Sequence, residues 1–294
     1  IGSTKGDIIT GGAGADTLTP GIGADTVDGG TGTDTYVIAS GQVGANVEGT
    51  GTGTSIGMAI NLGTTDITGG VVFSETGEYL SDGAALSAGT ARYTFDAEGS
   101  INSSAYDTIS NVEDIDASTA GVHYIKGGTG ATNITVGAAA NVTAADFFDG
   151  GDVTGTSNTD TIIVTSDNDA TGAAFEDLTG IETITVNPAS TATHDVVLAF
   201  AYSAANTDAI TIDLTPRTNA SADSTVNLST DGDADGYFTV NGGAGADTIT
   251  AGDGGALITG NKGADIISGH AGVDTIVFSS TATLNGSDAI TNFT

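Results

Sequence analysis

The sequence has very few basic residues. Only 5 Lys and Arg stand against 37 Asp and Glu among 294 residues, so the formal net charge is -32 at pH 7. A protein that binds nucleic acid needs a basic face to neutralise phosphates, and an anionic membrane attracts basic segments. The composition therefore excludes nucleic acid as a partner and argues against binding to an anionic membrane.

Cysteine, tryptophan and long apolar runs are also missing. The longest apolar stretch, 196–202, is far too short to span a bilayer, so we expect no membrane insertion. Without cysteine the fold does not depend on disulfides, which suits the cytosol and the cell exterior equally well. The chain begins and ends within a repeating pattern, so we expect it to be an interior piece of a longer protein.

The abundant residues predict β structure. The chain has 49 Thr, 46 Gly and 30 Asp. Glycine is costly inside helices, whereas threonine favours strands and aspartate favours turns and caps. High net charge with few aromatics is typical of disorder, but 38% of the residues are apolar. We therefore expect an all-β protein that folds once something offsets the repulsion among its carboxylates.

A nine-residue repeat organises the start of the chain. Asp7, Asp16, Asp25 and Asp34 lie nine positions apart, and an apolar residue follows each of them two positions later. These apolar residues are Ile9, Leu18, Val27 and Tyr36. The glycines that recur with the same period are Gly12, Gly14, Gly21, Gly23, Gly30 and Gly32.

The same repeat returns near the other end of the chain. It places Asp247, Asp265 and Asp274 in phase, with Ala256 where a further aspartate belongs. The glycines of this second block are Gly243, Gly245, Gly263 and Gly272, and its apolar residues are Ile249, Ile258, Ile267 and Ile276.

Such a unit has the composition of a calcium-binding turn. Glycines allow positive φ and a close approach of the main chain to an ion, so the first six residues can turn with carbonyl oxygens pointing inward. Calcium accepts roughly six to eight oxygen ligands, whereas zinc prefers His or Cys, which these turns nearly lack. We predict several Ca²⁺ ions, held by the aspartates and glycines of the two blocks.

One carboxylate per turn is too little charge for a tight site, so we expect two turns to share an ion. If successive units form opposite sides of a coil, turns eighteen residues apart stack. The predicted pairs are Asp7 with Asp25, Asp16 with Asp34, and Asp247 with Asp265, while Asp274 faces Ala256 and holds an ion weakly or not at all.

The nonapeptides of residues 6–37 and 242–277 resemble the glycine-rich calcium-binding repeats of RTX proteins. That resemblance implies a parallel β-roll around Ca²⁺, type I secretion and an extracellular location at a bacterial cell surface. A second phrase, at 107–115, resembles a sequence that joins repeat blocks in large secreted RTX adhesins and S-layer proteins, and 180–186 is similar in kind. Both phrases are equally well interpreted as ordinary buried strands with one Glu at the edge.

The middle of the chain has short strands separated by Gly, Thr, Asn and Asp turns. We expect a β-solenoid from end to end, or two β-rolls that flank a sandwich-like insert near 39–120. Residues 127–135 keep the glycines of the repeat but lack its aspartate, and 143–148 resemble a short helical turn. The predicted domains are 1–38 (β-roll), 39–126 (β-rich insert), 127–240 (degenerate repeats) and 241–294 (β-roll).

Acidic phrases outside the repeat have two interpretations. Asp231, Asp233 and Asp235 follow the first half of an EF-hand loop, but Gly242 stands at the twelfth position, where that loop has Glu. They form either a partial calcium site or a solvated acidic turn. The same alternatives apply to residues 149–152 and 167–169.

We expect a calcium-dependent structural protein of a bacterial surface layer or filament. Calcium would order the fold and promote self-assembly, and a cell-surface polysaccharide is a further candidate partner. The alternatives are a calcium-stabilised adhesin segment and a β-helical enzyme that acts on polysaccharides. No enzyme is expected, because Arg92 and Arg217 stand alone and the histidines form no zinc-protease motif.

Overall fold

The computed structural model describes residues 1–39, 42, 57–67, 86–94, 101–119, 121, 123–138, 142, 146–151, 158–166, 173–175, 177–186, 196–200, 209–229, 237–279 and 286–293. In these ranges the regular secondary structure consists of strands, so the predicted all-β class is confirmed. The chain divides into two compact units, Ile1–Thr135 with Ala145–Asp160, and Val136–Ala144 with Thr161–Thr294.

Two ladders of strands make up the first unit. One has the order β1-β3-β7-β6-β5-β9-β11 and the other the order β2-β4-β8-β10. Their bounds are β1 (Ile8–Ala13), β2 (Thr17–Leu18), β3 (Thr26–Thr31), β4 (Thr35–Val37), β5 (Gly57–Asn61), β6 (Thr90–Thr94), β7 (Ile101–Ser110), β8 (Asp114–Asp116), β9 (Tyr124–Lys126), β10 (Asn133–Ala138) and β11 (Phe147–Asp149).

Strand β6 interrupts a parallel arrangement. It pairs antiparallel with β5 and with β7, whereas β7 pairs in parallel with β3 and β5 with β9. Strands β5, β6, β7 and β9 of the predicted 39–126 insert therefore continue the ladder that β1 and β3 begin, and β8 continues the ladder of β2 and β4. Residues 40–41, 43–56, 68–85, 95–100, 120 and 122 of that segment lie outside the described residues.

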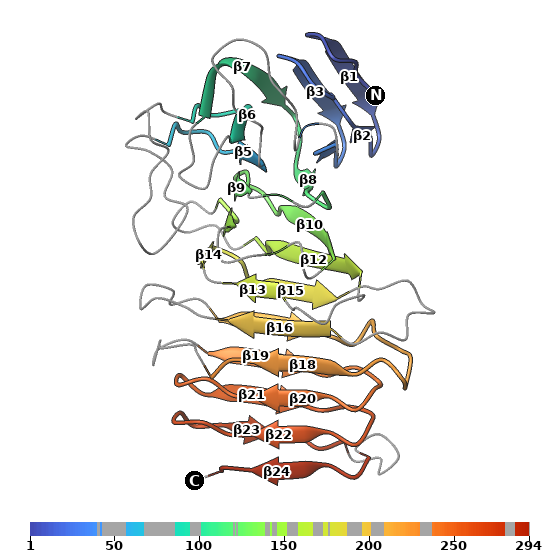
Figure 1. Cartoon of the computed structure of the whole chain (residues 1–294), viewed down its shortest axis with the longest axis vertical. Coiled ribbons are helices and arrows are strands. Elements are labelled where there is room, and N and C mark those ends of the chain that lie inside the picture. Colours follow the sequence, from blue (N-terminus) through green and yellow to red (C-terminus); the bar gives the residue numbers. More distant parts are fainter. Residues whose placement is uncertain are drawn as a thin grey trace. The chain divides into compact units, whose positions relative to one another are not determined.

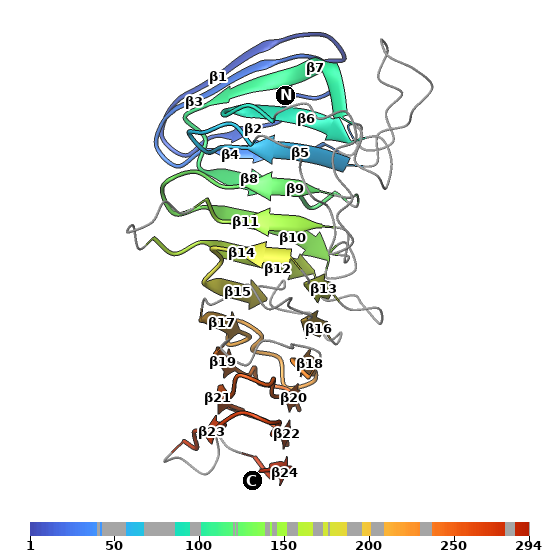
Figure 2. The same cartoon turned by 90° about the vertical axis from the view of Figure 1, so that its left-hand side faces the viewer.

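The second unit also has two ladders, seen as two columns of strands in Figure 2. One runs β12-β15-β17-β19-β21-β23 and the other β13-β16-β18-β20-β22-β24. The bounds are β12 (Thr161–Ser166), β13 (Ala173–Phe175), β14 (Asp177–Thr179), β15 (Thr183–Val186), β16 (Val196–Phe200), β17 (Ile210–Asp213), β18 (Ser224–Asn227), β19 (Phe238–Asn241), β20 (Thr248–Thr250), β21 (Ala256–Thr259), β22 (Ile266–Ser268), β23 (Thr275–Ile276) and β24 (Ala289–Thr291).

From β15 onward, successive strands alternate between the two ladders, so each coil of the chain adds one rung to each, as Figure 1 shows for β19 to β24. The rungs pair in parallel. In the repeat blocks of both units the register advances by eighteen residues, as in Ile9 opposite Val27 and Ile249 opposite Ile267. Two nonapeptides thus complete one coil, which is the arrangement expected for a β-roll.

Apolar side chains stack between the ladders. One column of the second unit runs, rung by rung, through Ile162, Ile184, Ile212, Val240, Ile258 and Ile276. The first five of these side chains are fully buried. Burying an isoleucine stabilises the fold by about 1.5–3 kcal/mol, and the alternate residues of each strand face outward.

The helical turn predicted at 143–148 is wrong for the part that the structure describes. Phe147 and Phe148 lie in β11, which pairs with β9. The Phe147 ring stacks on that of Tyr124, with centroids 4.6 Å apart. Packing between neighbouring strands therefore outweighs the local capping signal.

Candidate metal centre

The repeat aspartates stack as their spacing predicts. The main-chain N–H of each aspartate donates to the Oδ1 atom of the aspartate eighteen residues later. The distances are 2.7 Å for Asp7 to Asp25, 2.8 Å for Asp16 to Asp34 and 2.9 Å for Asp247 to Asp265. All three predicted pairs are therefore in contact.

The interrupted repeat stacks in the same way. The Ala256 N–H donates to Asp274 Oδ1 over 3.0 Å, so Asp274 faces an alanine methyl group in place of a second carboxylate. Ala256 is fully buried, whereas Asp274 is half-buried. This pair offers half the charge of the others.

The stacked aspartates of successive coils form carboxylate columns, and these columns continue beyond the residues that the repeat predicts. The Asp25 N–H donates to Asp107 Oδ1 over 2.9 Å, and the Asp34 N–H donates to Glu113 Oε2 over the same distance. Both acids belong to the 107–115 phrase, so this phrase supplies two carboxylates to the columns and is more than a buried strand. Its resemblance to RTX sequences was the signal for them.

The column of the second unit continues to Asp288. Its Oδ1 atom accepts the Asp265 N–H over 3.1 Å. The signal was present in the sequence, because Gly286, Asp288 and Ile290 have the spacing of the second half of a nonapeptide. The register that brings them into line advances by 23 residues instead of 18, which hid the match.

The second carboxylate oxygen separates the turns into two groups. We call the first group the closed turns, those of Asp7, Asp247 and Asp274. In each closed turn the Oδ2 atom accepts the main-chain N–H of the residue four positions earlier, over 2.6, 2.7 and 3.0 Å. The carboxylate of a closed turn is therefore used by its own turn.

We call the second group the open turns, those of Asp16, Asp25, Asp34 and Asp265. In each open turn the Oδ2 atom is buried and has no hydrogen-bond partner among the described residues. A buried polar atom left without a partner costs about 1–3 kcal/mol, and more when it is charged. Each open turn therefore needs a cation or a proton.

The main chain distinguishes the same two groups. In every open turn the residues four and two positions before the aspartate have positive φ, and the N–H that would close the turn does not bond to Oδ2. In the closed turns neither position has such a φ. The values are +115° and +112° at Gly12 and Gly14, +91° and +155° at Gly21 and Gly23, +102° and +143° at Gly30 and Gly32, and +64° and +129° at Asn261 and Gly263.

Stacked turns bring carbonyl oxygens against the glycines of the next coil. A Cβ atom on Gly30 would lie 2.1 Å from the carbonyl oxygen of Gly12, and one on Gly32 would lie 2.0 Å from that of Gly14. No real Cβ atom tolerates such a distance, so both positions require glycine. The unpartnered carboxylate oxygens of Asp16 and Asp34 thus lie in turns where main-chain carbonyls of one coil lie against glycines of the next.

Burial raises the pKa values of these carboxyls. It raises the pKa of Asp265 to about 7, and the neighbouring acids Asp247, Asp288 and Asp223 act in the same direction. Burial likewise raises the pKa of Asp247 to about 6 and that of Asp25 above its ordinary value. Without a positive charge nearby, these groups lose part of their tendency to ionise at neutral pH.

The donor set fits calcium. Among the described residues no three Asp, Glu or His side chains converge on one point, so an ion has to use main-chain carbonyls together with carboxylates. Such an all-oxygen set suits Ca²⁺ and not Zn²⁺. The carboxylates of Asp16, Asp25, Asp34 and Asp265, with carbonyls of the stacked turns, would hold the ions. Calcium would supply the charge that keeps the carboxyls ionised.

One column ends on a hydroxyl group. Asp107 is buried, and its Oδ2 atom accepts the Tyr36 O–H. Burial raises the pKa of Asp107 to about 7, and the hydrogen bonds from Tyr36 and Asp25 oppose that rise. Tyr36 stands at the apolar position of the repeat, two residues after Asp34. Its ring is therefore buried in the core, while its hydroxyl group donates a hydrogen bond to the carboxylate column.

The other acidic phrases give no calcium geometry in the described structure. Asp231, Asp233 and Asp235 lie outside the described residues, as do 167–169 and Asp152. Asp149 forms an ion pair with Lys126 and accepts the Gly151 N–H over 2.8 Å. Its carboxylate is therefore engaged by the protein itself.

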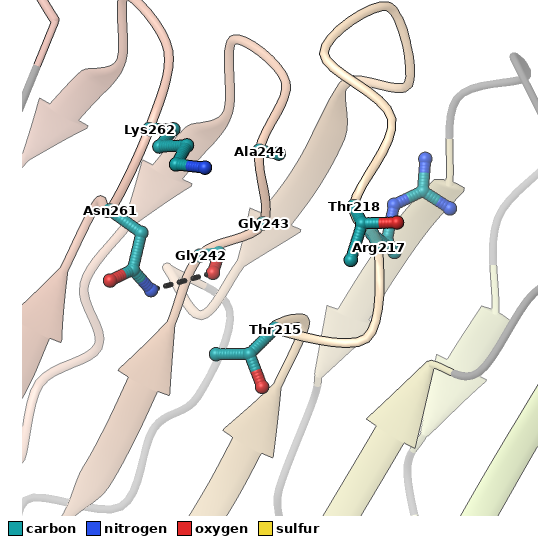
Figure 3. Close-up of a pocket in the computed structure, with 8 residues that line it drawn as sticks. All are labelled: Thr215, Arg217, Thr218, Gly242, Gly243, Ala244, Asn261 and Lys262. Atoms are coloured by element: carbon teal, nitrogen blue, oxygen red, sulfur yellow. Dashed lines mark hydrogen bonds between the residues drawn. The ribbon is translucent and has the colours of Figure 1, made fainter. Parts of the chain in front are cut away.

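A cavity of about 210 Å³ opens beside the turn of Asp247, with the lining residues shown in Figure 3. Its lining includes Thr215, Thr218, Asn261 and Lys262, and the Asn261 amide donates to the Gly242 carbonyl over 2.8 Å. The Arg217 guanidinium points away from Asn261 and Lys262 in this view. Lys262 is therefore the charged group on this side of the cavity.

Comparison with protein families agrees with this geometry. The family described as RTX calcium-binding nonapeptide repeat (4 copies) matches residues 1–36, 239–255 and 251–280. No curated protein gives a significant match. In the part of the chain that the structure describes, no helix is long and apolar enough to cross a membrane. The matched segments contain the stacked aspartates, so these two parts of the chain carry RTX-type calcium-binding nonapeptide repeats.

Proposed function

We propose that the chain is part of a calcium-dependent structural protein of a bacterial surface layer or filament. RTX repeats are typical of secreted proteins. In the proposed function, calcium orders the coils after the protein reaches the cell exterior, and ordered copies then associate with one another. The protein acts by its shape and rigidity, without catalysis.

The observation that carries the proposal is the unpartnered carboxylate oxygen of each open turn. Four such atoms are buried among stacked turns in a chain of net charge -32. Without cations, both the burial of these oxygens and the overall charge repulsion oppose folding. The free energy of calcium binding then contributes to the free energy of folding, because the stacked turns that form a site do not exist in the unfolded chain.

Self-association has support in the outer rungs. In the described structure, β1 and β24 each pair with a strand on one side only. Each of these strands carries an exposed apolar side chain: Ile8 in β1 is 84% exposed and Ile290 in β24 is 41% exposed. A rung of a second copy can add to such an edge by parallel strand pairing, and a contact that does not close on itself gives a filament or a lattice.

The test is a calcium titration of the purified chain, with magnesium as the control. Circular dichroism should show β signal that rises with Ca²⁺ and not with equal Mg²⁺, which demands a stricter octahedron. Light scattering and negative-stain microscopy should show particles that grow at the same calcium concentrations. A β signal unchanged by chelator contradicts the calcium-dependent fold, and a monomer with filled sites contradicts the assembly.

The adhesin alternative has one observation in its favour. Asp107 and Glu113, which extend the carboxylate columns, belong to the phrase that resembles sequences of secreted RTX adhesins. An adhesin segment would remain monomeric with calcium bound and would bind a cell-surface polysaccharide. The same titration, followed by binding to a polysaccharide array, separates the two functions.

A further inference from the structure

The first unit has a histidine where the repeat has its aspartate. His123 stands immediately before β9, as Asp25 stands immediately before β3. Gly121 precedes it by two positions and the buried Ile125 follows it by two, as in the nonapeptides. The sequence around His123 therefore keeps the spacing of a repeat turn without its acid.

The coils stack at His123 as they do in the carboxylate columns. Strand β9 lies between β5 and β11 in its ladder, and it pairs in parallel with both. The His123 N–H donates to Asp146 Oδ1 over 2.6 Å, which is the contact that joins the repeat aspartates. On the other side, the Met58 N–H donates to Nδ1 of His123 over 3.2 Å. The imidazole thus accepts the N–H that Oδ1 accepts in the acidic turns.

The second ring nitrogen closes the turn. Nε2 of His123 lies 2.9 Å from the carbonyl oxygen of Thr119, four positions earlier. In the closed turns of Asp7, Asp247 and Asp274, the second carboxylate oxygen also bonds to the residue four positions earlier. The two ring nitrogens therefore take the places of the two carboxylate oxygens.

These two partners fix the position of the proton on the ring. A main-chain N–H can only donate and a carbonyl oxygen can only accept, so Nδ1 carries no proton and Nε2 carries one. His123 is 3% exposed, and burial lowers its pKa below the ordinary value of 6.5, while the hydrogen bond to Thr119 opposes that fall. Both ring nitrogens are bonded in the neutral imidazole, so this turn needs no cation.

The acids around His123 bond elsewhere. Strand β5 carries no titratable side chain. The titratable groups beside His123 and on the segment that leads to Thr119 are Asp114, Asp116, Tyr124, Lys126, Asp146 and Asp149. The Asp146 carboxylate accepts the main-chain N–H of His123, and Asp149 pairs with Lys126. In the described structure the imidazole bonds to Met58 and Thr119 only. A proton added to Nδ1 would therefore point at the Met58 N–H and find no acceptor there.

We propose that His123 makes this coil an acid-sensitive link, held by a neutral imidazole where the repeat uses a carboxylate, and opened when the ring is protonated. The inference goes beyond the proposed function, because it requires no metal at this coil. Below pH 6.5 an opened coil binds a proton that the closed coil excludes, so the stability of the coil falls as pH falls toward the lowered pKa of His123. Asp107 and Asp265, whose pKa values are raised, act in the opposite direction, so the measurement has to be local.

Amide exchange detected by NMR in the full chain, with excess Ca²⁺, is such a measurement. The Met58 amide reports on the bond to Nδ1, and its protection factor should fall about tenfold between pH 7.5 and pH 5.5, because the opened form gains about tenfold for each pH unit below 6.5. The Leu228 amide, which bonds to the Thr250 carbonyl in the second unit, is the control and should keep its protection. Equal protection of Met58 at the two pH values overturns the inference.

Substitutions identify the group that titrates. His123→Asn places Oδ1 where Nδ1 accepts the Met58 N–H and does not titrate, so the protection of Met58 should become equal at the two pH values. His270→Asn removes an exposed histidine and is the matched control, which should keep the tenfold fall. A tenfold fall that persists in His123→Asn assigns the effect to another group and refutes the inference.

The ring itself gives a readout that needs no folded variant. In the unmodified chain, imidazole nitrogen-15 shifts at pH 6 should show His123 neutral, with its proton on Nε2. A His123 ring that is charged at pH 6 while the Met58 amide stays protected would contradict the proposal. Both readouts report on His123 whether or not calcium binds at the open turns, whereas calorimetric titration with Ca²⁺ tests the proposed function.

Discussion

The main-chain N–H of Asp247 donates to Oδ1 of Asp265 over 2.9 Å, while Oδ2 of the same Asp265 is buried without a hydrogen-bond partner among the described residues. One oxygen fixes the register of two coils, and the other is left for a cation. Because the two oxygens of a single carboxylate have these separate roles, a nine-residue repeat needs an acid at one position only.

Substitution of open and closed turns should therefore have unequal effects on calcium binding. Asp265→Asn keeps the Oδ1 acceptor but removes the charge, and we expect affinity at that site to fall by about 10–100-fold. Asp274→Asn, in a closed turn that faces Ala256, should change affinity little. Calorimetric titration of both variants checks this, and equal losses would show that the two kinds of turn do not differ in metal binding.

Glycine positions offer a second comparison. Gly30 has φ of +102° and its added Cβ would lie 2.1 Å from Gly12 O, so Gly30→Ala should destabilise the first block by more than about 1 kcal/mol. Gly128 stands at the same position of the degenerate repeat, where an added Cβ would meet nothing closer than 3.9 Å. Thermal unfolding should therefore show a clear drop for Gly30→Ala and almost none for Gly128→Ala. A similar drop in both would mean that crowding does not decide the cost.

Periodicity was sufficient to predict the all-β class, the eighteen-residue register and the three aspartate pairs. Those features depend on local spacing, which a sequence displays directly. The continuation through Asp107, Glu113 and Asp288 could not be placed, because inserts between the coils shift the register away from eighteen. The acids of a column can therefore be far apart in the sequence.

The difference between open and closed turns could not be predicted from the sequence either. Gly243 and Gly21 occupy the same position of the repeat, yet only Gly21 has positive φ. What surrounds each turn decides this: Arg217 packs on Gly243, whereas the carbonyl of Ser3 faces Gly21.

Tyr36 should be needed most when calcium is absent. Tyr36→Phe keeps the buried ring but leaves Asp107 Oδ2 without the O–H that it now accepts, at a cost of about 1–3 kcal/mol. The melting temperature should fall more in chelator than in calcium, because an ion in this column can compensate the same charge. Tyr237→Phe is the control, since Tyr237 is 41% exposed. An equal fall under both conditions would assign Tyr36 to packing alone.

The calcium-free chain should lose stability as pH rises, contrary to the usual behaviour of acids in folded proteins. The pKa values of Asp107 and Asp265 are raised by burial to about 7, above the ordinary value of 3.8. Between these values the folded state holds protons that the unfolded state has released, so the free energy of unfolding falls with pH and levels off above about 7. Calcium binds the ionised carboxylates, so its affinity should rise through the same window, with protons released on binding. Metal-free melting temperatures from pH 4 to pH 8, with calorimetry in buffers of different ionisation enthalpy, measure both effects. A metal-free melting temperature that rises across this window would mean that these carboxyls are already ionised and compensated by the protein, and calcium would then have no charge left to neutralise.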